Sequence, residues 1–180
     1  MSLIVEDGSV VPDADTFLSL ASARDLAAKF GVELPAVDSD LEVLLRKSYL
    51  NLLNSERTLQ GERVSGTQTG IFPRFNVYNN CTLVDADVIP KEVLMAQLYS
   101  SEGINAGANT NEITTGERLK SFAVVGAYTE TYQDGSSTSM NARIQGVINS
   151  LYPLTKSGYI SSPCGGGGTG VSVPNYGFLG

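Results

Sequence analysis

Hydrophobic positions in the first half of the chain recur at the three- and four-residue steps of amphipathic helices. Between residues 39 and 60 they predict one helix, whose buried face carries Leu41, Leu44, Leu45, Ser48 and Leu52. Ser39 and Glu42 have the spacing of a capping box, which predicts that this helix begins at Ser39. Weak helix formers follow Leu52, and Gly61 is the expected stop.

Two further helices follow from the same pattern. One is predicted to be capped by Ser19 and to end at Gly31, with its inward face formed by Leu20, Ala23, Leu26, Ala27 and Phe30. The other begins at Pro90 and is expected to be the most enclosed, because it is apolar around much of its circumference at Val93, Leu94, Met95, Ala96, Leu98 and Tyr99. Short extended segments are predicted at residues 3–5 and 16–18.

The pattern changes to alternation between residues 117 and 133, which predicts a β-hairpin with its turn near Gly126. Residues 103–116 are expected to form an exposed loop and residues 134–138 a second turn. A short amphipathic helix should follow, capped by Ser139 and ended by Pro153, with an apolar face of Met140, Ile144, Val147, Ile148 and Leu151.

These elements predict a mainly α fold: a small helical bundle with an inserted β-hairpin and an extended C-terminal tail. We expect a helical domain over residues 1–158, which includes the hairpin at 117–133, and a glycine-rich tail over residues 159–180. Four consecutive glycines in this tail supply a tether. A set of apolar residues follows the glycines and is expected to dock onto a partner or to fold back on the chain's own domain: Val171, Val173, Tyr176, Phe178 and Leu179.

Composition then excludes broad classes of function. The net charge is −7, from 12 basic and 19 acidic residues, whereas proteins that grip nucleic acid usually present a basic face. There is no histidine, which removes the commonest general base and metal ligand. We expect no membrane-spanning segment and no signal peptide, and we expect Cys81 and Cys164 to be ordinary thiols.

Two stretches could be read as chemical sites. Residues 165–170 are rich in glycine but lack the strand, helix and Lys-Ser/Thr of a phosphate loop, so a linker is favoured. Asp85, Asp87 and Glu92 could hold a metal, but carboxylates near a helix start are better explained by capping and by the helix dipole. We therefore predict no catalytic residue, no metal and no cofactor, and we do not expect an enzyme.

The segment of residues 61–74, called the motif loop below, is polar and punctuated by glycine. Its charges Arg63 and Arg74 could reach a carboxylate on a neighbouring subunit. The favoured interpretation is that each braces its own loop, by bonding backbone carbonyls or by stacking on Phe72 or Tyr78.

The motif loop also carries a resemblance to a known family. A long helix followed by Gly-x-Arg-Val-Ser-x-x-Gln and by an apolar-aromatic-Pro-Arg step resembles the neck adaptor (head–tail connector) proteins of tailed bacteriophages. Some members of that family bear the label DnaT-like single-stranded DNA-binding protein. The resemblance extends from Leu3 to about Tyr152, and the matching residues are Gly61, Arg63, Val64, Ser65, Gln68, Phe72, Pro73, Arg74, Val77 and Tyr78. Phe72 stands where the family often has Trp, and the tail after Gly158 has no counterpart.

The resemblance implies a structural virion protein, made in the host cytoplasm and located in the phage neck. It would form a ring of twelve copies, bind the portal protein and a tail or nozzle protein, and let genomic double-stranded DNA pass without sequence-specific binding. The exposed edges of the hairpin point to a ring interface at Phe122, Val124, Tyr128 and Tyr132, and the tail would dock onto the portal or an adjacent subunit. The inner wall of the ring should be acidic or neutral, since lysines and arginines would hold phosphates.

Two other functions remain open. One is a soluble nucleic-acid-binding accessory protein. Proteins that bind single-stranded DNA combine a basic groove with aromatic side chains on which the bases stack, but along this sequence the aromatic residues are not interleaved with Lys or Arg. The other is a small enzyme, which would show a titratable catalytic pair in a pocket.

Overall fold

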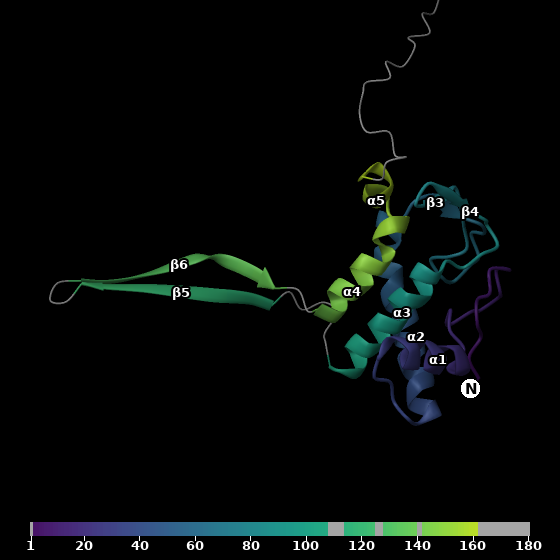
Figure 1. The fold of residues 1–180 in the computed structure, drawn as a ribbon, viewed down its shortest axis with the longest axis horizontal. Coiled ribbons are helices and arrows are strands. Elements are labelled where there is room, and N and C mark those ends of the chain that lie inside the picture. Colours follow the sequence, from purple (N-terminus) through teal and green to yellow (C-terminus); the bar gives the residue numbers. More distant parts are fainter. Residues whose placement is uncertain (1, 108–113, 125–127, 140–141, 162–180) are drawn as a thin grey trace, which may run out of the picture.

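The structure is a computed structural model that describes residues 2–107, 114–124, 128–139 and 142–161, with side chains for residues 2–107 and 145–159. It confirms the predicted mainly α class. The helices are α1 (Leu20–Phe30), α2 (Asp38–Leu52), α3 (Lys91–Asn105), α4 (Ala142–Leu151) and α5 (Lys156–Ser161), with short 3-10 turns η1 (Leu53–Thr58) and η2 (Tyr152–Leu154). α3 lies at the centre of the body, in contact with α1, α2 and α4 (Figure 1). None of the helices in the described ranges is long and apolar enough to span a membrane.

The apolar periodicity predicted the face of α2 correctly, but two residues assigned to the inward faces of other helices are exposed: Phe30 of α1 at 48% and Ile148 of α4 at 42%. Ser19 caps α1 by accepting a hydrogen bond from the Ser22 N–H at 3.1 Å, and Gly31, in the left-handed conformation at φ 68°, ends it. The predicted face of α2 is buried at every position, and Tyr49 joins it.

The predicted ends of α2 are wrong. The helix begins at Asp38, no side chain caps it, and Glu42 pairs with Arg46 at 3.5 Å instead of forming a capping box with Ser39. The helix ends at Leu52, well before Gly61, and continues as η1. There the hydroxyl of Thr58 bonds the Ser55 carbonyl at 2.7 Å, which is the competition with helical bonding expected of such side chains.

Three two-stranded antiparallel sheets complete the described chain. They pair β1 (Glu62–Arg63) with β2 (Arg74–Phe75), β3 (Val77–Asn79) with β4 (Thr82–Val84), and β5 (Thr114–Val124) with β6 (Tyr128–Ser139). The first two pairs were not predicted, because strands of two or three residues carry no alternation. The extended segments predicted near the N-terminus meet only through a single parallel bridge between Val5 and Thr16.

The predicted hairpin is confirmed and is longer than expected. Its strands run through residues 134–138, predicted as a turn, and begin at Thr114 within the predicted loop. A register shift between Gly116 and Arg118 allows the ladder to continue past the polar and glycine-containing positions. α3 also continues to Asn105 in the predicted loop, Ser139 ends β6 instead of capping α4, and α4 passes into η2 at Tyr152. The predicted turn at Gly126 lies outside the described residues.

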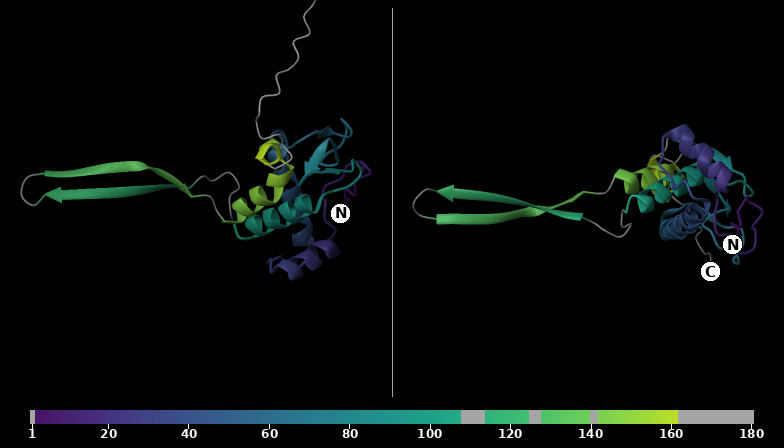
Figure 2. Two further views of the ribbon diagram at one scale, coloured as in Figure 1. Left: turned by 45° about the horizontal axis from the view of Figure 1, so that its top comes forward. Right: turned by 90° about the horizontal axis from the view of Figure 1, so that it is seen from below.

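Figures 1 and 2 show the β5–β6 hairpin extending away from the helical body, while α4 and α5 return along α3 toward the β3–β4 sheet. The body holds two hydrophobic clusters. One joins α1, α2 and α3 through Leu18, Ala23, Ala27, Leu41, Leu44, Leu45 and Leu98. The other joins α2, α3 and the C-terminal helices to the motif loop through Phe17, Tyr49, Leu52, Leu59, Ile71, Phe72, Val77, Val93, Ala96, Leu151 and Leu154.

A buried amide on α3 ties these parts together. Gln97 is fully buried, and its Nε2 donates to the Thr16 hydroxyl at 2.9 Å and to the Leu45 carbonyl at 3.0 Å. Its Oε1 accepts the N–H of Phe17 at 2.9 Å. This one side chain thus hydrogen-bonds buried groups of both the N-terminal segment and α2, and these bonds fix the positions of both against α3.

We predict that Gln97→Leu lowers the free energy of unfolding by about 2–3 kcal/mol, because it removes the partner of the buried Phe17 N–H and one of the bonds to the Leu45 carbonyl, which keeps its bond from the Ser48 hydroxyl. Chemical denaturation followed by circular dichroism measures this. Gln145→Leu, at an exposed position of α4, is the matched control and should change stability by no more than about 0.5 kcal/mol. Equal effects of the two variants would contradict the role given to Gln97.

Candidate functional site

The motif loop is anchored in the core by its apolar step. Ile71 and Phe72 are both completely buried, and they belong to the cluster formed with α2 and α3. The Phe72–Pro73 peptide bond is cis. The aromatic residue of the family motif is therefore a core residue of this chain.

A carboxylate outside the motif organises the charges of the loop. The carboxylate of Glu56, on η1, accepts two hydrogen bonds from Arg63, from Nε at 2.5 Å and from Nη2 at 2.6 Å. It also accepts one from Arg74 Nη1 at 3.4 Å. The Nη1 of Arg63 donates to the Gln68 carbonyl at 2.8 Å. Sequence analysis missed Glu56, because it lies on a polar stretch with no regular spacing to either arginine.

Arg74 is the most enclosed charge of the site, with a side chain only 6% exposed. Its Nε donates to the Gln60 carbonyl at 2.8 Å, its Nη2 to the Gly61 carbonyl at 2.8 Å and its Nη1 to the Ile71 carbonyl at 3.3 Å. Both arginines thus brace their own loop through backbone carbonyls, as the favoured interpretation predicted. Their guanidinium groups are engaged within the chain.

The electrostatics follow from these contacts. The hydrogen bond from Arg63 holds the pKa of Glu56 below its usual value, against the opposing effect of partial burial. The bond from Glu56 raises the pKa of Arg63. Burial lowers the pKa of Arg74, and Glu56 opposes this shift. One carboxylate therefore compensates two cations, and the site is a structural charge cluster.

Gln68 closes the loop on itself. Its side chain is nearly buried, its Oε1 accepts the Ser65 N–H at 3.2 Å, and its Nε2 donates to the carbonyls of Gly70 and Pro73, each at 3.1 Å. The polar motif residues are consequently used in shaping the loop.

Gln60, just before the loop, was also missed from the sequence. Its Oε1 accepts the Tyr78 N–H at 3.0 Å, while its Nε2 donates to the carbonyls of Tyr78 at 2.9 Å and Pro153 at 3.1 Å. Its backbone N–H donates to the Leu154 carbonyl at 3.0 Å. Gln60 therefore fastens β3 and the C-terminal turn to the loop, a relation between distant segments that no local pattern reveals.

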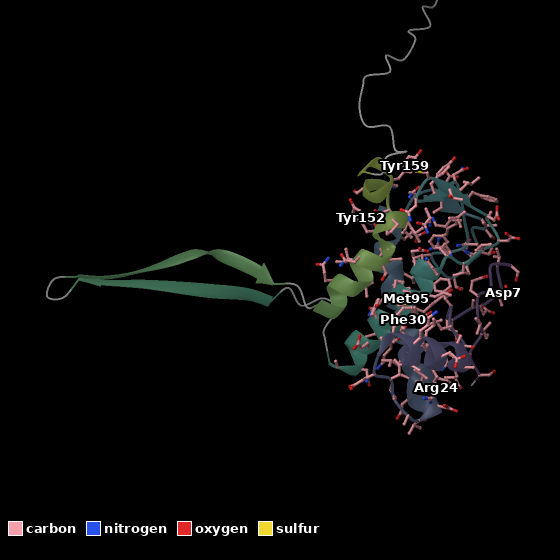
Figure 3. All side chains as sticks on the ribbon, viewed as in Figure 1. Asp7, Arg24, Phe30, Met95, Tyr152 and Tyr159 are labelled. Atoms are coloured by element: carbon pink, nitrogen blue, oxygen red, sulfur yellow. The ribbon has the colours of Figure 1, made fainter. Side chains whose placement is uncertain are left out.

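A pocket of about 400 Å³ opens where these segments meet. It is lined by Gln60, Gly61, Asn76, Tyr78, Lys156 and Tyr159. The rings of Tyr78 and Tyr159 lie 5.3 Å apart at an interplanar angle of 35°, and Lys156 Nζ donates to the Arg57 carbonyl at 3.2 Å. Figure 3 labels Tyr159 on α5, at the end of the body where the C-terminal helices meet the β3–β4 sheet.

The hairpin register places the four predicted interface residues. Phe122 pairs with Glu130, Val124 with Tyr128, and Lys120 with Tyr132. These are alternate pairs of the ladder, which belong to one face of a two-stranded sheet. Whether that face forms a ring interface stays a prediction. The predicted docking residues from Val171 to Leu179 lie outside the described residues.

The carboxylates before α3 and Cys81 differ from what the sequence predicted. Asp85 and Asp87 do not cap α3, since its N-cap is Pro90 without a side-chain bond; only Glu92 stands in the first turn. No group of three or more potential metal ligands occurs among the described side chains.

Cys81 is disulfide-bonded, so the prediction of an ordinary thiol is wrong for it; Cys164 lies outside the described residues.

The geometry defines a small helical scaffold that carries a braced loop, a pocket and a projecting hairpin. A sequence model of the family described as putative DnaT-like ssDNA binding protein matches residues 1–173. The chain belongs to this family. No curated protein and no solved structure matches the chain.

We predict that Glu56 makes stability pH-dependent. A carboxylate whose pKa is depressed on folding contributes stability that is complete above the unfolded pKa and is lost as the pH falls through the folded pKa. Glu56→Gln should therefore cost roughly 2 kcal/mol at neutral pH, less than a fully buried pair because the Glu56 side chain is 31% exposed. The difference from the wild type should shrink on acidification.

Urea denaturation at a series of pH values measures this difference. Glu33→Gln, which removes a charge from an exposed connecting residue, controls for net charge. A destabilisation by Glu56→Gln that stayed constant from neutral to strongly acidic pH would contradict the assignment.

Proposed function

We propose that this protein is a structural adaptor of a tailed-phage neck, a subunit that assembles into a ring on the portal. The observation that carries the proposal is the β5–β6 hairpin, with strands of 11 and 12 residues that extend away from the body (Figure 1). An isolated two-stranded sheet is marginal in water and needs a partner surface. Its unpaired edges are suited to pairing with a neighbouring chain.

The rest of the body supports a scaffolding role. Arg24, Arg46, Arg63 and Arg74 form ion pairs with carboxylates of the same chain, so these charges do not build a basic groove. Together with the net charge of −7, this suits a channel wall past which DNA slides without being held. The ring of twelve copies, the portal and tail-side partners, the passing genomic DNA and the location in the virion are parts of this proposal.

The second candidate is a nucleic-acid-binding accessory protein. The family description favours it, since it names single-stranded DNA binding. The pocket also brings two tyrosines and a lysine together in space, which the sequence alone did not suggest. Binding by an extended basic groove would show a steep dependence on salt, whereas an adaptor without such a groove would not.

We predict that Val124→Glu impairs assembly and leaves the monomer folded, because it places a charge on the predicted interface face of the hairpin. The matched control is Ala123→Glu, one residue earlier, whose ladder partner is Thr129 and which belongs to the opposite face. Sedimentation of each variant, alone and with the portal protein, measures assembly. Normal rings from Val124→Glu would show that this face is not the interface.

A further inference from the structure

We propose that the pocket between β3 and α5 binds one unstacked base of a single-stranded nucleic acid, with Tyr159 as the stacking surface and Lys156 as the contact to the adjoining phosphate. This inference rests on the second candidate function and gives it a site. It does not depend on ring assembly.

The aromatic part of the pocket has the properties of a stacking platform. The backbone N–H and carbonyl of Tyr78 are both bonded to the side chain of Gln60, which holds this residue of β3 at the pocket. Tyr159 lies against it and remains partly exposed at the mouth. Bases stack on such rings irrespective of their identity, because every base has a π face. The volume of about 400 Å³ lies in the range of small-molecule sites.

The positive charge of Lys156, beside the two tyrosine rings, is not used in an ion pair among the described side chains. The ion pairs formed among the described side chains use Arg24, Arg46, Arg63 and Arg74, and they include neither Lys156 nor Arg57. Lys156 is exposed, and its bond to the Arg57 carbonyl holds the ammonium group at the rim of the pocket. Arg57 is exposed on the adjoining turn η1. A phosphate next to a stacked base would meet the ammonium group of Lys156, which lines the pocket.

This arrangement also explains how an acidic chain could bind nucleic acid. With one or two phosphate contacts, most of the affinity comes from stacking. The dependence of log K on log salt should then be shallow, about −0.7 for each phosphate contacted on a single strand. A protein with an extended basic groove would show a several-fold steeper slope.

Another occupant is conceivable. α5 ends at Ser161 beside the pocket, and the following segment contains Tyr176 and Phe178. An aromatic side chain of that segment would fit the same walls. The stacked base is favoured here because the pocket combines its rings with the exposed Lys156 and because the family description names single-stranded DNA.

The test is fluorescence anisotropy of a labelled short oligothymidine titrated with the full-length protein at low salt. We expect measurable binding with a shallow salt slope. Tyr159→Ala and Lys156→Glu should each weaken it roughly tenfold, since stacking on one aromatic ring is lost in the first and a phosphate contact in the second. Tyr159→Phe keeps the ring and should bind like the wild type.

Tyr152→Ala and Lys47→Glu are the matched controls, at an exposed tyrosine and an exposed lysine that do not line the pocket, and they should bind normally. Melting temperatures check folding, and Lys156→Glu at an exposed position keeps the test valid if Tyr159→Ala is unstable.

Three results would overturn the inference. Failure to bind both in the wild type and in the variant with Tyr176 and Phe178 replaced by alanine would remove the site and the second candidate function. Binding that is equally strong in the wild type, Tyr159→Ala and Lys156→Glu would leave that function standing and show that its site lies elsewhere. Binding that appears only after Tyr176 and Phe178 are replaced by alanine would show that the chain's own segment fills the pocket.

Discussion

The burial of Arg74 is the constraint on which the rest of the structure depends. A guanidinium group that is 6% exposed must be compensated, or its desolvation would cost several kcal/mol. Glu56 supplies the opposite charge, and the carbonyls of Gln60, Gly61 and Ile71 accept hydrogen bonds from the guanidinium of Arg74. Because these groups come from η1 and from both ends of the loop, satisfying Arg74 fixes the path of a glycine-punctuated chain. That path is what lets Ile71 and Phe72 enter the core.

The same constraint shapes the surface. The side chains of the motif residues Arg63, Gln68 and Arg74 form bonds within the chain and shape the loop. The two regions to which a function is proposed, the β5–β6 hairpin and the pocket beside Tyr78 and Tyr159, lie outside this braced loop. Gln60 connects the braced loop to the pocket, because its side chain bonds both β3 and the C-terminal turn at the place where the pocket forms.

The sequence predicted those features that depend on local periodicity. The buried face of α2, the cap at Ser19, the stop at Gly31 and the existence of the hairpin all follow from spacing along the chain. The face of α1 was predicted one residue too long, because Phe30 lies at the end of the helix and is exposed. The capping box at Ser39 failed because the helix begins at Asp38, so that Ser39 is not at the N-cap, and Glu42 pairs with Arg46. The hairpin was predicted too short, because a ladder with a register shift continues through residues that would otherwise favour turns.

The candidate site was predictable only in part. Bracing by Arg63 and Arg74 could be foreseen, since a glycine-rich polar loop needs such bonds. Glu56, Gln60 and the approach of Tyr159 to Tyr78 could not, because each relation joins segments that only the tertiary fold brings together.

The most direct test of the proposed adaptor function is negative-stain imaging of the protein mixed with the portal ring of a tailed phage. A structural adaptor should appear as added density forming a ring on the portal, with a continuous central channel. Bare portals, together with a protein that stays monomeric and binds single-stranded DNA, would contradict the adaptor function and support the accessory DNA-binding function instead.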